Sequence, residues 1–294
     1  MYAIECKNLT HYYGKKLVYE NLSFHVGEGS ILGLLGKNGA GKSTTINILN
    51  GFLQPHSGNC YIYGEDSQHL TPANKARIGF LIEGHIQYAF MNITQIEKFY
   101  SGMYPNWKRE PYWELMAKLK VQPLQKISTM SCGQRSQVAL GLILAQDPDL
   151  LILDDFSMGL DPGYRRLFID YLREYAKAEK KTIFTTSHII QDMERLIDDV
   201  LIMDYNRILA QQPISEFMKN FKQFRFTLDN PQAVIPKNEL IWNVEQIHDK
   251  VECYTYASEE NLKQYLSGSQ INYTGFTEVT MSLEDAFIGL TGKY

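Results

Sequence analysis

A lysine and a serine beside a run of glycines are the residues of this chain best suited to phosphate chemistry. The segment from Gly36 to Ser43 reads G-x-x-x-x-G-K-S, between the apolar run 31–35 and the helix-like stretch 44–50. Glycines let the backbone wrap around a phosphate chain with its N–H groups pointing inward, and a helix N-terminus adds the positive end of its dipole. We expect Lys42 to reach the β- and γ-phosphates of a nucleotide and the Ser43 hydroxyl to bind Mg²⁺.

The nucleotide is expected to contact the loop backbone, the first turn of the helix and an aromatic ring. Tyr13, which precedes Gly14, could stack on the adenine, because aromatic faces suit bases. A purely structural role is the alternative, since the chain has 19 tyrosines. The expected loop contacts are Gly36, Asn38, Gly39, Ala40, Gly41, Lys42, Ser43 and Thr44.

Two carboxylates end the apolar run 150–153. A strand beside the phosphate loop places such a carboxylate near the metal, and Mg²⁺ prefers oxygen ligands, so Asp154 fits a metal-binding role. Asp155 would then face the γ-phosphate and polarise the attacking water. The alternative is a solvated strand end.

Three further positions have both a structural and a functional interpretation. Ser131 and Gln134 form an S-x-x-Q pattern at the start of an apolar helix, which indicates a capping box and also an N-terminus able to meet an anion. His188 ends a strand where a γ-phosphate sensor would lie. Glu83 follows the strand 78–82 as an uncompensated carboxylate, unless it is simply exposed.

The composition, net charge and cysteine spacing of the chain exclude several classes of protein. The chain has 294 residues, 21% of them charged, and a net charge of −4, which provides no electrostatic basis for binding nucleic acid. Its four cysteines are far apart and form no C-x-x-C pair, so we expect neither a zinc site nor a disulfide framework. No secretory signal is visible, and the apolar runs are too short to span a bilayer. A membrane role would therefore require a partner subunit.

The hydrophobic periodicity predicts β-rich and helical parts. Strand candidates in the first part are 2–9, 22–26, 31–35, 61–63 and 78–82. Helical spacing prevails from 92 to 145. Strands at 150–155, 182–187 and 200–204 then alternate with helices at 163–178 and 190–196. That alternation is typical of a largely parallel sheet covered by helices.

The C-terminal part differs in pattern. Gln211-Gln-Pro213 indicates a boundary, and beyond it 224–228 and 251–256 alternate like strands, while 261–266 and 283–290 have helical spacing. We expect a domain at 1–215, with a helical subdomain at about 84–147, and a small α+β domain at 216–294.

Taken together, residues 1–215 resemble the ATP-binding subunit of an ABC transporter. Gly36–Ser43 matches the Walker A motif, Leu150–Asp155 the Walker B strand, and Met130-Ser-Cys-Gly-Gln134 the signature that normally reads LSGGQ. Leu160-Asp161-Pro162 matches the D-loop. His188, Tyr13 and Glu83 match the switch histidine, the adenine-stacking aromatic and the Q-loop position.

The resemblance implies a P-loop α/β core with an antiparallel β subdomain and an all-helical subdomain. It implies a head-to-tail dimer around two ATP molecules, in which the loop of one subunit faces the partner's Ser131, Gly133 and Gln134, with Asp161 close by. The resemblance assigns catalytic roles to Lys42, Asp155, His188 and Glu83. It assigns metal binding to Ser43, Asp154 and Glu83. A groove near Glu83 would couple the dimer to a transmembrane permease, placing the chain peripherally on the cytoplasmic face of the cell membrane.

The C-terminal part, with its ending Met281–Gly292, resembles the appendix of the drug, lantibiotic, peptide-toxin and polysaccharide export branch. The chain departs from the family at three places: Asp155 replaces the catalytic glutamate, Cys132 a signature glycine, and Glu83 the usual glutamine. We expect slow hydrolysis because the shorter Asp155 retracts its carboxylate. The dimer could be a homodimer or a heterodimer with a second ATPase.

Two other functions are alternatives to that of an exporter ATPase. A soluble ABC protein acting on ribosomes or DNA is disfavoured, because the chain has one cassette, no heptad run and a negative net charge. An ATP-gated dimerisation or regulatory module with little hydrolysis stays open because of Asp155.

Overall fold

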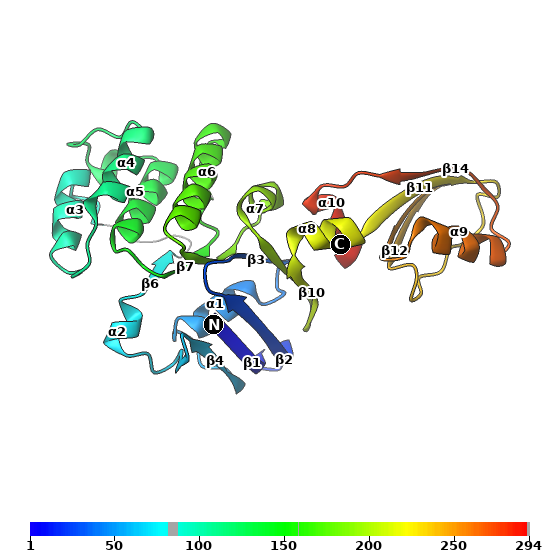
Figure 1. The fold of residues 1–294 in the computed structure, drawn as a ribbon, viewed down its shortest axis with the longest axis horizontal. Coiled ribbons are helices and arrows are strands. Elements are labelled where there is room, and N and C mark those ends of the chain that lie inside the picture. The colour runs from blue at the N-terminus through cyan, green and yellow to red at the C-terminus, as the bar shows by residue number, and fades with distance from the viewer. Residues whose placement is uncertain (82–87, 158, 293–294) are drawn as a thin grey trace. The chain divides into compact units, whose positions relative to one another are not determined.

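The computed structural model describes residues 1–81, 88–157 and 159–292. The chain forms two compact units, Met1–Ile208 and Leu209–Tyr294 (Figure 1). Each contains a hydrophobic core of its own. Among the described residues, no helix combines the length and the apolar character that crossing a bilayer requires.

A six-stranded sheet has the order β10-β9-β3-β8-β7-β6, and all of its strands except β10, which continues past Ile208, lie within the first unit. Its strands are β3 (Ile31–Gly36), β6 (Ile78–Leu81), β7 (Leu150–Asp154), β8 (Thr182–Thr186), β9 (Asp199–Asp204) and β10 (Arg207–Pro213). The pairs β9–β3, β3–β8, β8–β7 and β7–β6 are parallel, and Thr186 of β8 is in register with Leu34 on one side and Asp154 on the other. Because parallel strands end at one common edge, residues that follow β3, β7 and β8 meet there.

A second, antiparallel sheet has the order β2-β1-β4-β5. It consists of β1 (Tyr2–Tyr13), β2 (Lys16–Gly27), β4 (Ser57–Ile62) and β5 (Glu65–Asp66). Apolar residues of β1, β2, β3 and α1 (Lys42–Leu49) share one core with residues of β7 and β8. The helix that follows the glycine loop is therefore fixed between the two sheets.

A short helix precedes β6, and further helices lie between β6 and β7 and follow β7 and β8 (Figure 1). They are α2 (Pro72–Lys75), α3 (Ile93–Ser101), α4 (Arg109–Lys118), the 3₁₀ turn Ile127–Thr129, α5 (Cys132–Ala145), α6 (Pro162–Ala178) and α7 (Ile190–Leu196). The second half of α5, residues 138–145, is buried all round because its sequence is apolar on every face. Buried Glu97 ties α3 to α4 by accepting hydrogen bonds from Trp107 and Arg109. The expected helical insert is thus observed.

The second unit is an antiparallel sheet with helices. Its elements are α8 (Ile214–Asn220), β11 (Lys222–Leu228), β12 (Asn243–Ile247), β13 (Lys250–Thr255), α9 (Glu259–Gly268), β14 (Tyr273–Val279) and α10 (Leu283–Thr291). The strand order is β12-β13-β11-β14. Leu262 and Leu266 of α9 share the core with Phe224 and Phe226 of β11. The α+β character expected for this part is present, while Gln211-Gln-Pro213, interpreted as a boundary, ends strand β10.

Candidate nucleotide site

The glycine loop connects β3 to α1 in the way that phosphate binding requires. Gly39 and Gly41 have φ values of +83° and +101°, which glycine adopts at little cost. A Cβ at Gly41 would lie 2.7 Å from the ring of Tyr19, so this position also admits no side chain. Gly41 caps α1 without a side-chain hydrogen bond. The first N–H groups of α1 therefore have no capping side chain and suit an anion.

Lys42 lies in this loop with its ammonium over the backbone. Its Nζ donates to the carbonyl of Gly36 at 2.6 Å and to that of Lys37 at 3.3 Å. Burial lowers the pKa of Lys42 from its usual value, and the negative charges of Asp155 and Asp154 oppose that shift. The two carboxylates thus act on the lysine from the end of β7, and strand β8 lies between β7 and β3.

Asp154 and Asp155 are both organised by Thr186, at the end of β8. The Thr186 hydroxyl donates to Asp154 Oδ1 at 2.5 Å and accepts a hydrogen bond from the Asp155 amide at 3.3 Å. Asp155 has a φ of +46°, a strained value for a residue with a side chain. Thr186 was not predicted from the sequence, where it is one of many strand threonines.

His188 binds both carboxylate oxygens of Asp155. Its backbone N–H donates to Asp155 Oδ1 at 2.8 Å, and its Nε2 lies 3.0 Å from Oδ2. The Asp155 side chain is buried, whereas about half of the His188 side chain is exposed. The strand-end histidine and the second carboxylate therefore form one pair at the edge of the sheet.

Tyr13 and the first turn of α1 lie together. Tyr13, the last residue of β1, is 53% exposed, and its hydroxyl is 3.4 Å from Thr44 Oγ1. Ser43, Asn38 and Gly39 are exposed, which leaves them open to a ligand. The structure thus places an exposed aromatic ring next to the predicted phosphate loop.

The remaining predicted contacts meet in a separate hollow of about 200 Å³. It is lined by residues of α5 and of the segment before α6, among them Ser131, Gly133, Gln134 and Asp161. The predicted capping box is confirmed: Ser131 Oγ accepts from the Gln134 amide, and Gln134 Oε1 accepts from the Ser131 amide. Cys132 is exposed at the first position of α5.

The chain is similar in sequence to known ATP-binding proteins. Residues 19–157 match the family model for the ABC transporter. An ABC transporter ATP-binding protein of Methanocaldococcus jannaschii, itself uncharacterised, is 32% identical and covers 81% of this chain and 88% of its own length. The Nod factor export ATP-binding protein I of Paraburkholderia xenovorans is 30% identical over 99% of this chain and 97% of its own. The chain belongs to the ATP-binding subunits of ABC transporters.

Other comparisons agree with this membership. The bacitracin transport ATP-binding protein BcrA of Bacillus licheniformis is 28% identical, over 98% of this chain and 97% of its own. The solved structure of an ATP-binding subunit of an ABC transporter superposes with a TM-score of 0.64 at 25% identity, over 74% of this chain and 92% of that one. This subunit therefore has an ABC ATPase fold, and its relatives include subunits named for export.

Glu83, the expected Q-loop residue, lies outside the described residues. Gly133, in the signature, is sterically required, because a Cβ there would lie 2.8 Å from the carbonyl oxygen of Gly159. That contact joins the start of α5 to the D-loop segment, and Gly159 was not predicted.

The segment after Asp155 is fixed by another group that the sequence did not reveal. Ser157 donates to Asp192 Oδ2 at 3.1 Å, and the Arg165 guanidinium lies 3.0 Å from the same oxygen. Ser157 and Asp192 are buried. This link attaches the residues just after β7 to α6 and α7.

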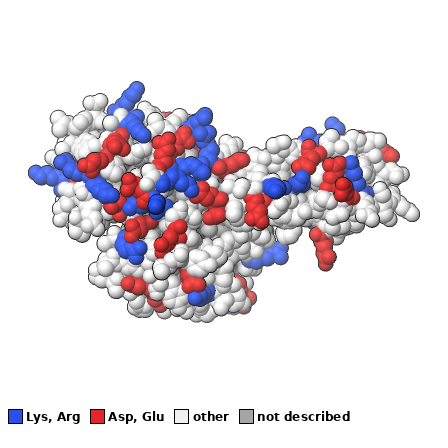
Figure 2. Space-filling model, viewed as in Figure 1, with Lys and Arg blue, Asp and Glu red and all other residues white. Residues whose placement is uncertain are grey.

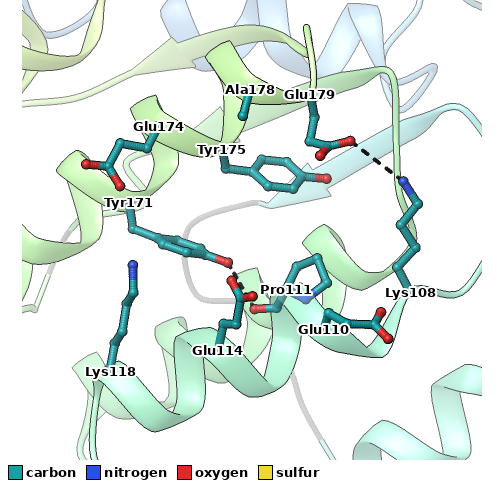
Figure 3. Close-up of a pocket in the computed structure, with 10 residues that line it drawn as sticks. All are labelled: Lys108, Glu110, Pro111, Glu114, Lys118, Tyr171, Glu174, Tyr175, Ala178 and Glu179. Carbon is teal, nitrogen blue, oxygen red and sulfur yellow. Dashed lines mark hydrogen bonds and ion pairs between the residues drawn. The ribbon is translucent and has the colours of Figure 1, made fainter.

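A larger hollow of about 370 Å³ lies between α4 and α6, outside the nucleotide contacts (Figure 3). Charges of both signs line it, and Lys108 is paired with Asp147 and Glu179. Over the face that Figure 2 presents, Lys and Arg also alternate with Asp and Glu. The hollow contains none of the predicted site residues.

Proposed function

We propose that this subunit hydrolyses ATP to drive a membrane exporter of drugs, peptides or toxins. Hydrolysis is supported by the cluster of side chains at the sheet edge. There the negative charges of Asp154 and Asp155 act on Lys42, and His188 is paired with the Asp155 carboxylate. The export part is supported by relatives named for Nod factor export and bacitracin transport, which align along nearly the whole chain.

The donor set at this edge suits Mg²⁺ with a triphosphate. Ser43 is an exposed hydroxyl in the first turn of α1, and Asp154 provides a carboxylate oriented by Thr186. Mg²⁺ prefers such oxygen ligands and takes few of them from protein when phosphates supply others. When bound, the ion would neutralise charge on the phosphates.

The residues of this chain would promote in-line attack of water on the γ-phosphorus. Lys42 and the N–H groups of α1 stabilise charge on the phosphate oxygens. Asp155, oriented by His188, aligns the water and accepts its proton, the bond from the γ-phosphorus to the bridging oxygen breaks, and ADP and phosphate leave. Tyr13 would stack on the adenine.

We infer that the complete site needs two subunits. The signature contacts line a hollow formed by α5 and the D-loop segment, separate from the phosphate loop, so each could serve a different nucleotide. An Asp155→Asn variant, which still binds ATP but hydrolyses it more slowly, should elute as a dimer with Mg-ATP and as a monomer without it. A persistent monomer would indicate a heterodimer with a second ATPase.

An exposed aromatic surface supports docking to a permease. Tyr88, Phe90, Phe99 and Met103 are 44%, 71%, 36% and 58% exposed, and Tyr88 contacts both phenylalanine rings. Clustered exposed apolar side chains mark interaction sites. Binding there would hold the subunit at the cytoplasmic face of the membrane.

The decisive experiment measures phosphate release by the purified chain with Mg-ATP. We expect ATPase activity that a Lys42→Ala variant loses, and we expect export when the subunit is expressed with its permease.

A regulatory function is the second candidate. It is favoured by the contacts of His188 with both carboxylate oxygens of Asp155. Tight ATP binding with no product in single-turnover measurements would support that function and contradict hydrolysis.

A further inference from the structure

Two cysteines face each other across neighbouring strands in the core of the first unit. Cys6 of β1 is in register with Cys60 of β4, and their Sγ atoms are 2.9 Å apart. Both are buried, with 1% and 2% of their surface exposed. We propose that this pair is a site of reversible oxidation, where the two thiols form a cross-strand disulfide.

The backbone is already suited to this bond. Residues directly opposite in an antiparallel pair have Cα atoms about 4.5–5.5 Å apart, within the roughly 4.4–6.8 Å that a disulfide spans. The register is regular from the pair Ile4 and Ile62 to the pair Lys7 and Asn59, so the two strands are aligned on both sides of the cysteines. The sulfurs need to approach by only about 0.9 Å to reach bonding distance.

The position of the pair relates it to the ATP loop. The chain between Cys6 and Cys60 contains β2, β3, the loop 36–43 and α1, so the disulfide would close a ring around the nucleotide-binding segment. Tyr19 shares the apolar core with both cysteines. Its ring packs directly against Gly41, and its hydroxyl accepts a hydrogen bond from Thr45 at 3.4 Å. Because Tyr19 and the two cysteines belong to one core, we expect a movement of the cysteines to change the packing beneath the loop.

The chemistry needs an oxidant that accepts two electrons, such as the diazene compound diamide. One thiolate adds to the N=N bond, and the second thiolate displaces the resulting hydrazine while the S–S bond forms. Two thiols lose two protons and two electrons, and the diazene becomes a hydrazine. Burial, followed by contact with Cys60, raises the pKa of Cys6 well above its usual value, so oxidation should be slow at neutral pH.

The test is to oxidise the full native chain with diamide at pH 8.5, quench with acid, unfold the chain and alkylate the remaining thiols. The four cysteines should accept two alkyl groups instead of four, and peptide mapping should recover Cys6 linked to Cys60. Dithiothreitol should restore all four thiols. Four alkylated cysteines after oxidation, or a principal link to Cys132 or Cys253, would overturn the proposal.

Variants supply the matched comparison. Cys253→Ser removes another buried cysteine and should leave the link intact, whereas Cys60→Ser should abolish it. If Cys60→Ser fails to fold, the peptide map of the unmodified chain still decides the question. Affinity for a fluorescent ATP analogue should differ between the reduced and the oxidised chain by about fivefold or more. Equal affinities would refute the link to the ATP loop.

Discussion

At the residue scale, Asp155 has a shorter side chain than the glutamate usual in the family, and His188 contacts both of its carboxylate oxygens. A glutamate would extend the carboxylate by roughly 1.5 Å, and a misplacement of about 1 Å can change a rate by about 100-fold. We expect Asp155→Glu to raise the turnover of the purified chain by about tenfold or more. Asp154→Glu is the control and should lower turnover, because it displaces the carboxylate that we propose binds Mg²⁺. Steady-state phosphate release measures both, and an unchanged or lower rate for Asp155→Glu would contradict the argument.

Thr186 is a positioning residue, because its hydroxyl contacts both aspartates and no described contact gives it another function. Thr186→Val keeps the shape of the side chain and removes the hydroxyl. We expect the Mg²⁺ concentration for half-maximal activity to rise several-fold, since Asp154 loses its orienting donor.

Thr185→Val is the matched control. Its hydroxyl donates to the carbonyl of Leu153 and contacts neither aspartate. Both variants should lose stability by about 1 kcal/mol, which urea unfolding checks. The same Mg²⁺ dependence in both variants would show that Thr186 acts only through stability.

These residues show which parts of the candidate site could be predicted from the sequence. Lys42, Asp155 and His188 were predicted because each ends a strand or begins a helix at the same edge of a parallel sheet. Thr186 and Tyr19 were not, since their importance depends on which side chain lies across the next strand or beneath the loop, and no spacing in the sequence encodes that.

At the scale of elements, close approach of backbones fixes the signature helix. Gly133 and Gly163 are each the second residue of a helix, in α5 and α6. An added Cβ at Gly133 meets the Gly159 carbonyl, whereas nothing lies within 4 Å of one at Gly163. We expect Gly133→Ala to cost about 1–3 kcal/mol and Gly163→Ala to be neutral or stabilising by up to ~1 kcal/mol. Thermal unfolding of the two variants tests this, and equal midpoints would contradict it.

Elements with a buried face were predicted well, and exposed or short ones were not. The periodicity located β7, β8 and α7 to within a residue or two at each end. It missed β14, which is largely exposed and contains Gly275 at a φ of +66°, and β10, whose Gln211-Gln-Pro213 end was interpreted as a boundary. Without burial on one face, a strand has no alternation to detect.

At the scale of the whole molecule, we expect His11 to make the stability of the first unit depend on pH. Its side chain is buried, its Nε2 has no hydrogen-bond partner, and its Nδ1 is 3.4 Å from His56 Nδ1. The rings of Tyr13 and His56 pack against it. Burial, followed by the charge of His56, lowers the pKa of His11 from its usual value.

The sign of the pH effect follows from that shift. Below about pH 6.5 the unfolded chain binds a proton at His11 that the folded chain does not. The free energy of unfolding should therefore decrease as the pH is lowered, by at most about 1.4 kcal/mol per pH unit for this group. Replacing His11 with Gln should flatten the dependence between pH 7 and pH 5. His69→Gln, which changes an exposed histidine, should leave it unchanged. Urea unfolding at a series of pH values measures these slopes, and an undiminished slope in His11→Gln would assign the acid sensitivity to other groups.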